Sequence, residues 1–167
     1  MGRSRNSCRP EMPGLSLLEL LVTLAIIAIL ALIGVPAYDG MIEAQRLRAA
    51  AEALAADLRW ARSEAIKRGV PVRFACNSGG HWSCSVVADA DGNGSFDDAP
   101  LKRVAAADFP SVSLAASFGG NAQTLFEPVR ATASAGELVL SAASLSARVS
   151  LSAAGAVGIC GPRGYPC

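Results

Sequence analysis

A long apolar run near the N-terminus limits what this chain can fold into more than any other feature. The 21 residues from Leu15 to Val35 carry one charged side chain, that of Glu19. As a helix this run would be roughly 30 Å long, which matches the hydrocarbon core of a bilayer. It is also longer than the apolar centre of a secretory signal peptide, which has about 7–15 residues. The run therefore predicts a single transmembrane helix.

The charges on either side of the run predict its orientation. Arg3, Arg5 and Arg9 precede it, whereas Asp39 and Glu43 follow it. Arginine and lysine are enriched on the cytoplasmic side of membrane helices. We therefore expect the N-terminus in the cytoplasm and the rest of the chain on the other side of the membrane.

The carboxylate of Glu19 is out of place in such a segment. A charged group at the centre of a membrane helix costs about 2.5–3.5 kcal/mol on insertion scales. An ionisable residue in a membrane segment therefore suggests a function and a partner for its charge.

The helical pattern continues beyond the apolar run. Pro36 marks the outer end of the run and is expected to kink the helix there. Apolar residues then recur every three or four positions, which predicts an amphipathic helix packed on a domain. They are Leu47, Ala51, Leu54, Leu58, Ala61 and Ala65. The charged residues of this segment fall mostly on its other faces. Gly69 is a C-cap residue, so one helix is expected from about Leu15 to Arg68.

Beyond Gly69 the sequence favours strands separated by glycine and asparagine turns. Apolar and polar residues alternate in five segments, which are 72–76, 101–104, 112–114, 137–140 and 145–152. We expect the last two to pair with each other. The predicted fold class is α+β, in which a long N-terminal transmembrane-plus-amphipathic helix packs on a mainly antiparallel β-sheet domain.

Five cysteines bear on the redox compartment. Cys8 precedes the apolar run, and the other four, Cys76, Cys84, Cys160 and Cys167, follow it. An even number of cysteines outside the cytoplasm suggests disulfides. Four cysteines allow three pairings. The two local pairs are the simplest because each closes a short loop, but the sequence leaves the pairing open.

The N-terminal segment resembles the type IV prepilin signal. It has a short basic leader ending in Gly14, an apolar start at Leu15, glutamate at the fifth place after the glycine, and Pro36 further on. The resemblance implies that a prepilin peptidase cuts between Gly14 and Leu15, and that Leu15 is then N-methylated. The first mature residue of such proteins is usually phenylalanine, so Leu15 departs from the pattern.

This resemblance divides the chain into four parts. Residues 1–14 are the cleaved leader, 15–36 the transmembrane half of the helix, 37–69 its amphipathic half, and 70–167 a periplasmic β-rich domain. It also implies a role for Glu19 in assembly. Its carboxylate would meet the N-terminal ammonium of a neighbouring subunit in an apolar setting, where an unpaired charge is unfavourable.

Two further segments look like the GspH/FimT group of minor pilins and pseudopilins. They are the helix end, 57–69, and the segment 86–97 followed by Leu101-Lys102-Arg103. The resemblance implies a structural subunit, not an enzyme, that acts in tip assembly of a type IV pilus or a type II secretion pseudopilus. Its partners would be other pilins or pseudopilins, prepilin peptidase and the inner-membrane assembly platform. It would be a single-pass bacterial inner-membrane protein with a periplasmic C-terminal domain. The motifs do not distinguish the pilus from the secretion machine.

One acidic loop allows a calcium interpretation. Oxygen-bearing residues occupy alternate positions, as in the first nine places of an EF-hand loop. They are Asp89, Asp91, Asn93, Ser95 and Asp97. However, Pro100 stands where a bidentate glutamate is required. A turn between two strands is the plainer explanation, and no cofactor is otherwise expected.

The sequence gives little support for a zinc site or an enzyme. Cys76, His81 and Cys84 offer three metal-binding side chains, whereas structural zinc normally takes four. A disulfide between the two cysteines would remove them as ligands or nucleophiles. The sequence has no nucleophile-elbow pattern and no phosphate-binding glycine loop. A membrane-anchored periplasmic enzyme is thus the weakest alternative.

DNA binding is the main alternative activity, because some FimT-type minor pilins bind DNA through C-terminal arginines. Here that region offers Arg163, with Arg148 upstream. From Ala37 onward the chain has twelve basic and twelve acidic residues. One or two phosphate contacts would give weak and strongly salt-sensitive binding, so this role is an alternative to assembly.

Overall fold

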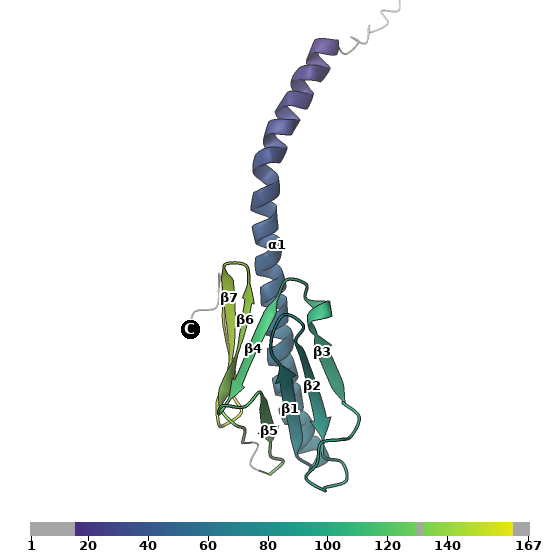
Figure 1. Cartoon of the computed structure of the whole chain (residues 1–167), viewed down its shortest axis with the longest axis vertical. Coiled ribbons are helices and arrows are strands. Elements are labelled where there is room, and N and C mark those ends of the chain that lie inside the picture. Colours follow the sequence, from purple (N-terminus) through teal and green to yellow (C-terminus); the bar gives the residue numbers. More distant parts are fainter. Residues whose placement is uncertain (1–15, 130–131, 162–167) are drawn as a thin grey trace, which may run out of the picture. The chain divides into compact units, whose positions relative to one another are not determined.

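The computed structural model describes residues 16–129 and 132–161, and within them the side chains of residues 33–37 and 39 are not described. The chain divides into two compact units, Met1–Asp39 and Gly40–Cys167. Figure 1 shows one long helix and a set of strands gathered around the half of the helix that belongs to the second unit.

The helix α1 spans Leu17–Arg68. It ends where the sequence predicts, because Gly69 adopts a positive φ of 69° and its N–H donates to the carbonyl of Ala65 at 3.0 Å. A glycine in this left-handed conformation is a common helix C-cap. Pro36 falls within the helix, but its side chain is not among those described. The predicted kink therefore stays a prediction.

In the described residues of the second unit, the strands form two four-stranded antiparallel sheets. The first has the order β3-β2-β1-β5 and the second β4-β6-β7-β8. The first-sheet bounds are β1 Val72–Asn77, β2 Ser83–Ala88, β3 Lys102–Ala105 and β5 Gln123–Phe126. The second-sheet bounds are β4 Ser113–Phe118, β6 Gly136–Ala142, β7 Leu145–Leu151 and β8 Val157–Cys160. A short 3₁₀ turn, Ala106–Asp108, follows β3. This is the predicted α+β class, and the predicted pairing of the last two alternating segments is confirmed as β6 with β7.

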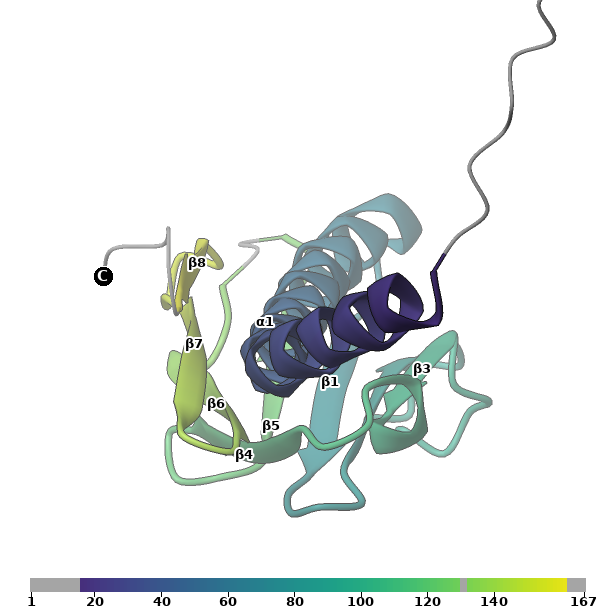
Figure 2. The same ribbon diagram turned by 90° about the horizontal axis from the view of Figure 1, so that it is seen from above.

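The second half of α1 forms the centre of the core. All six helix positions that the spacing predicts as apolar contacts are at most 1% exposed. They share one hydrophobic cluster with residues of both sheets, among them Phe74 of β1 and Leu138 of β6. In Figure 2 this part of the helix lies against the faces of both sheets. Burying one such leucine contributes about 1.5–3 kcal/mol, so this face of α1 holds the two sheets on a single core.

Two acidic residues of α1 are buried, which the spacing of the helix's apolar residues did not predict. Asp57 is 2% exposed and Glu64 is 5% exposed. Asp57 forms an ion pair with Lys102 of β3. Glu64 accepts a hydrogen bond from Nε of Arg68 at 2.5 Å, and Lys67 lies 3.8 Å away. Each carboxylate has a cationic partner, which offsets the free-energy cost of burying its charge.

Two helix arginines hold the start of β8. Nη1 of Arg62 donates to the carbonyl of Gly155 at 3.1 Å, and Nη2 of Arg59 donates to the carbonyl of Val157 at 3.3 Å. Both carbonyls are more than ninety residues away in the chain. The charges at the end of α1 therefore attach the second sheet to the helix.

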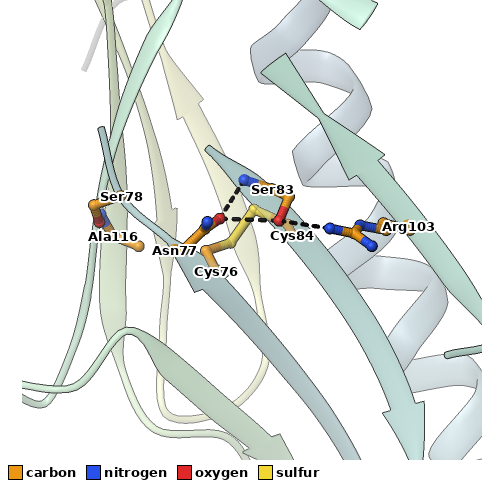
Figure 3. The surroundings of a disulfide bond; sticks show 7 residues. All are labelled: Cys76, Asn77, Ser78, Ser83, Cys84, Arg103 and Ala116. Carbon is orange, nitrogen blue, oxygen red and sulfur yellow. Dashed lines mark hydrogen bonds between the residues drawn. A yellow bond between two sulfur atoms is a disulfide. The ribbon is translucent and has the colours of Figure 1, made fainter. Parts of the chain in front are cut away.

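One predicted disulfide is present, between Cys76 and Cys84 (Figure 3). The two residues are direct register partners on β1 and β2. The N–H of Cys76 does not point toward β2 but donates to the carbonyl of Ala122, on the β5 side, at 2.9 Å. The cysteines thus form a non-hydrogen-bonded pair, the position where facing side chains come closest. Cys160 is disulfide-bonded as well. Cys167 lies outside the described residues, so the predicted second pair stays a prediction.

The loop after Cys76 connects the two sheets. Gly79 and Leu114 of β4 exchange two backbone hydrogen bonds, of 2.8 and 3.2 Å. The amide of Ala116 donates to the hydroxyl of Ser78 at 3.1 Å. The indole N–H of Trp82 donates to the carbonyl of Val112 at 2.8 Å. The disulfide closes this loop at its base and so supports the joint between the sheets.

Candidate functional site

The first part of α1 is an apolar surface that no other described residue covers. Every described side chain from residue 16 to 32 is exposed. The large apolar ones are Leu17, Leu18, Leu20, Leu21, Val22, Leu24, Ile26, Ile27, Ile29, Leu30 and Leu32. Because they occupy all sides of the helix, the segment is apolar all round. Such a helix is normally buried in lipid or among other helices. We call residues 17–32 the apolar segment.

Glu19 is the acidic residue in the first turn of this segment, and it is exposed. A carboxylate near a helix N-terminus is favoured by the helix dipole. The nearby hydroxyl of Thr23 donates to the carbonyl of Leu20 at 2.9 Å, so it is satisfied within the helix. Gly14 and Leu15, the predicted cleavage site, lie outside the described residues.

Across the residues whose placement is described, no helix combines the length and the apolarity that a membrane crossing requires. The predicted transmembrane segment begins at Leu15, outside those residues, and runs into the stretch whose side chains are not described.

The acidic loop between β2 and β3 uses its oxygens within the loop. The carboxylate of Asp91 accepts from the backbone amide of Asn93 at 3.2 Å and from its side-chain amide at 2.6 Å. The side chain of Asn93 in turn accepts from the amide of Ser95 at 2.6 Å. Such side-chain-to-backbone bonds stabilise a turn. Within the described ranges no three acidic, histidine or cysteine side chains form a group that could hold a metal ion.

Asp89 differs from the rest of this loop. It is 3% exposed, and Oδ2 accepts a hydrogen bond from the amide of Gly94 at 3.0 Å. Oδ1 is buried and has no hydrogen-bond partner. Asp89 therefore lies beneath the loop, where one of its oxygens organises the turn. Asp97, also predicted as a ligand, is exposed.

The structure bears differently on the zinc and the DNA alternatives. The thiols of Cys76 and Cys84 are joined in a disulfide, so they cannot act as zinc ligands beside His81. Arg148 of β7 forms an ion pair with Glu137 of β6 at 3.3 Å. The negative charge of Glu137 weakens the attraction of Arg148 for a phosphate group. Arg163 lies outside the described residues, so the proposed DNA contact stays an untested alternative.

Sequence reasoning missed one polar pocket, on the first sheet. It has a volume of about 400 Å³ and is lined by Arg73 together with residues of β5 and of the loops at 94–96, 121 and 134. Arg73 is the one charged residue of β1, at an outward position of an alternating strand. A charged residue at such a position is a signal, visible in the sequence, of a polar site on the outer face of the sheet. The other lining residues come from distant segments, so the sequence did not reveal the pocket.

The family described as "Type II transport protein GspH" matches residues 50–155. The chain belongs to this family. A Type II secretion system protein H from Xanthomonas campestris pv. campestris is 44% identical over 66 residues. That match covers 40% of this chain and about two-fifths, 39%, of the length of the relative.

Solved structures of the type IV minor pilin FimU from Pseudomonas aeruginosa have a similar fold. Two crystal forms match this chain with TM-scores of 0.52 and 0.56, each at 21% identity. The matches cover 71% and 75% of this GspH-family chain, and 99% and 98% of the FimU chains. The pilin-like fold predicted from the sequence is thus confirmed.

Proposed function

We propose that this protein is a minor pilin or pseudopilin, a structural subunit of a type II secretion pseudopilus or a type IV pilus. The observation that carries the proposal is the exposed apolar segment, residues 17–32, in the same helix that forms the core of a GspH-family domain. Apolar surface of this extent needs partners, and subunits that bundle their helices supply them. The relatives' names and the FimU-like fold support the same assignment.

The proposal includes processing and location. A prepilin peptidase removes residues 1–14, Leu15 becomes the N-methylated first residue, and the apolar segment holds the subunit in the inner membrane. The domain from residue 70 onward then lies in the periplasm. The basic leader, Gly14 and Glu19 in the sequence support this version.

Glu19 is proposed to set the register of assembly at the filament tip. Its carboxylate meets the ammonium group of a neighbouring subunit's N-terminus while both lie in an apolar setting. An unpaired charge there is strongly unfavourable. Docking is therefore favoured only where the two charges meet.

Cleavage can be tested with Gly14→Ala. We expect this variant to keep the unprocessed mass, because the peptidase requires glycine before the cut. Intact-mass spectrometry of the membrane-extracted protein is the measurement, with Gly2→Ala in the same leader as the matched control. A mature-size Gly14→Ala protein would contradict the cleavage assignment.

The machine that the subunit serves is tested by chemical crosslinking in native membranes followed by pull-down and mass spectrometry. Recovery of pseudopilins and the secretion platform would identify a secretion tip subunit, and recovery of pilus subunits a minor pilin. Recovery of neither, from membranes in which the protein is processed, would contradict the proposed function.

A further inference from the structure

The polar pocket on the first sheet contains an arginine, Arg73, that forms no ion pair with any described residue. Arg73 lies on β1, where Val72 and Phe74 face the core and Arg73 points to the opposite face of the sheet. Its Nη2 donates to the carbonyl of Phe96 at 2.9 Å, and its guanidinium carbon lies 4.9 Å from the centre of the Phe96 ring. The loop that carries Phe96 thus holds the guanidinium in place.

The guanidinium keeps unused hydrogen-bonding capacity. Nε is buried and makes no hydrogen bond. The ion pairs among the described residues do not include Arg73. A partly buried cation without a counter-charge is unfavourable, and the cation–π contact with Phe96 offsets only part of that cost. The site therefore gains from an added anion.

The other lining residues are neutral. They are Gly94, Ser95, Phe96, Asn121, Gln123, Thr124, Leu125 and Ser134. The hydroxyl of Thr124 already donates to the carbonyl of Ser134 at 3.1 Å. The remaining side-chain hydroxyl and amide groups can donate hydrogen bonds to oxygen atoms, and none adds a charge. A pocket with one positive charge balances one negative charge. A carboxylate fits both this charge and the planar fork of a guanidinium, whereas a phosphate dianion would leave an excess negative charge.

We propose that the Arg73 pocket binds a carboxylate group, either of an acidic side chain on a protein partner or of a small free carboxylic acid. Its volume of about 400 Å³ admits an aspartate or glutamate side chain with part of its backbone. The site does not depend on filament assembly. Only the version with a neighbouring subunit as the source rests on the proposed function.

Asp89 is the alternative group that could balance the charge of Arg73. It follows Val87, the register partner of Arg73, by two residues, and its Oδ1 is buried without a partner. It does not line the pocket. If Asp89 neutralised Arg73 from beneath the loop, the pocket would have no affinity for carboxylates until Asp89 was replaced.

The test uses the full chain in a detergent with an uncharged headgroup. The probe is N-acetyl-glutamate α-amide, and its neutral isostere N-acetyl-glutaminamide is the control ligand. Binding is followed by NMR through the backbone amides of residues 94–96, which line the pocket. We expect saturable shifts with the glutamate probe and none with the glutamine control. Equal responses to both ligands, or no response to either, would overturn the proposal.

Variants assign any binding to Arg73. Arg73→Gln should weaken affinity at least about tenfold, because a charge-assisted bond is lost. Arg73→Lys keeps the charge and should retain measurable binding. Binding by this variant would show that the loss in Arg73→Gln comes from the missing charge and not from misfolding. Arg103→Gln is the matched control on β3, where the exposed guanidinium contacts Ser83 at 3.4 Å. Binding that survives Arg73→Gln, or that appears only in Asp89→Asn, would overturn the proposal.

The source of the carboxylate is identified in cells with a photo-crosslinking residue at Gln123, an exposed position on the rim. Given probe binding by the purified chain, a protein adduct that disappears with Arg73→Gln supports the site and identifies a protein partner. Probe binding without any Arg73-dependent protein adduct supports the site and identifies a small carboxylic acid as the source. Failure of the proposed function would leave the probe experiment unaffected.

Discussion

Among single residues, Glu64 shows most clearly how a buried charge stabilises this fold. The hydrogen bond from Arg68 holds its pKa below the ordinary value of 4.5, and the charge of Lys67 acts in the same direction against the effect of burial. Both cations lie in the last turn of α1, where they also complement the helix dipole. These ion pairs lie within α1 and stabilise its C-terminal end.

This pairing predicts an acid-sensitive contribution to stability. Because the folded-state pKa of Glu64 lies below the unfolded one, the ionised pair stabilises the fold above pH 4.5, and the effect is lost as pH falls through the lowered pKa. We expect Glu64→Gln to lower the melting temperature at pH 7 and to reduce its further fall on acidification. Thermal denaturation followed by circular dichroism is the measurement.

The control is Glu52→Gln, which removes an exposed pair with Arg48 on the same helix. Exposed pairs of this kind contribute about 0.3–0.5 kcal/mol, so its effect at pH 7 should be smaller. A wild-type and a Glu64→Gln protein with parallel acid transitions would contradict the interpretation.

At the scale of elements, α1 is the part on which both sheets depend. Leu58 is fully buried in the shared core, whereas Ile66, eight positions further along the same helix, is 54% exposed. We expect Leu58→Ala to lower the free energy of unfolding by about 2–5 kcal/mol, because it removes buried contacts and leaves a cavity. Ile66→Ala, the matched control, should cost much less. Denaturant unfolding of the full chain measures both, and equal losses would show that the assigned face of α1 is wrong.

The Cys76–Cys84 disulfide supports the joint between the sheets. Replacing both cysteines with alanine should lower the free energy of unfolding by about 2–3 kcal/mol, the chain-entropy effect of closing so short a loop. Alanine is chosen because both side chains are buried. The measurement is denaturant unfolding without reductant, with the double variant compared against wild type. An unchanged midpoint would mean that the hydrogen bonds of the 77–82 loop hold the joint without the disulfide.

How far the sequence predicts each element depends on how local its signals are. The end of α1 was predictable because its period and its glycine cap lie within one segment. The β6–β7 pair was predictable because its alternation is long. The strands β5 and β8 are short, and β8 contains Gly158, so neither gave a clear pattern. The burial of Asp57 was missed because its partner, Lys102, lies 45 residues away.

At the scale of the whole molecule, the two compact units show opposite relations to solvent. The unit Gly40–Cys167 buries its apolar residues in a core of helix and two sheets. The described part of Met1–Asp39 exposes its apolar residues on every side. A chain that buries one apolar surface and exposes another is suited to assembly through the exposed one. The central claim is that other subunits cover residues 17–32.

Photo-crosslinking at Ile27 in native membranes tests this claim most directly, because Ile27 lies in the middle of the apolar segment and is 60% exposed. We predict adducts with pilin-like subunits, reduced when Glu19→Ala removes the carboxylate that sets the register. The photo-crosslinking residue placed instead at Ala107, an exposed position in the second unit, is the control for adducts that arise from random encounters. Processed protein that gives no subunit adduct at Ile27, or the same adducts with and without Glu19, would contradict the account.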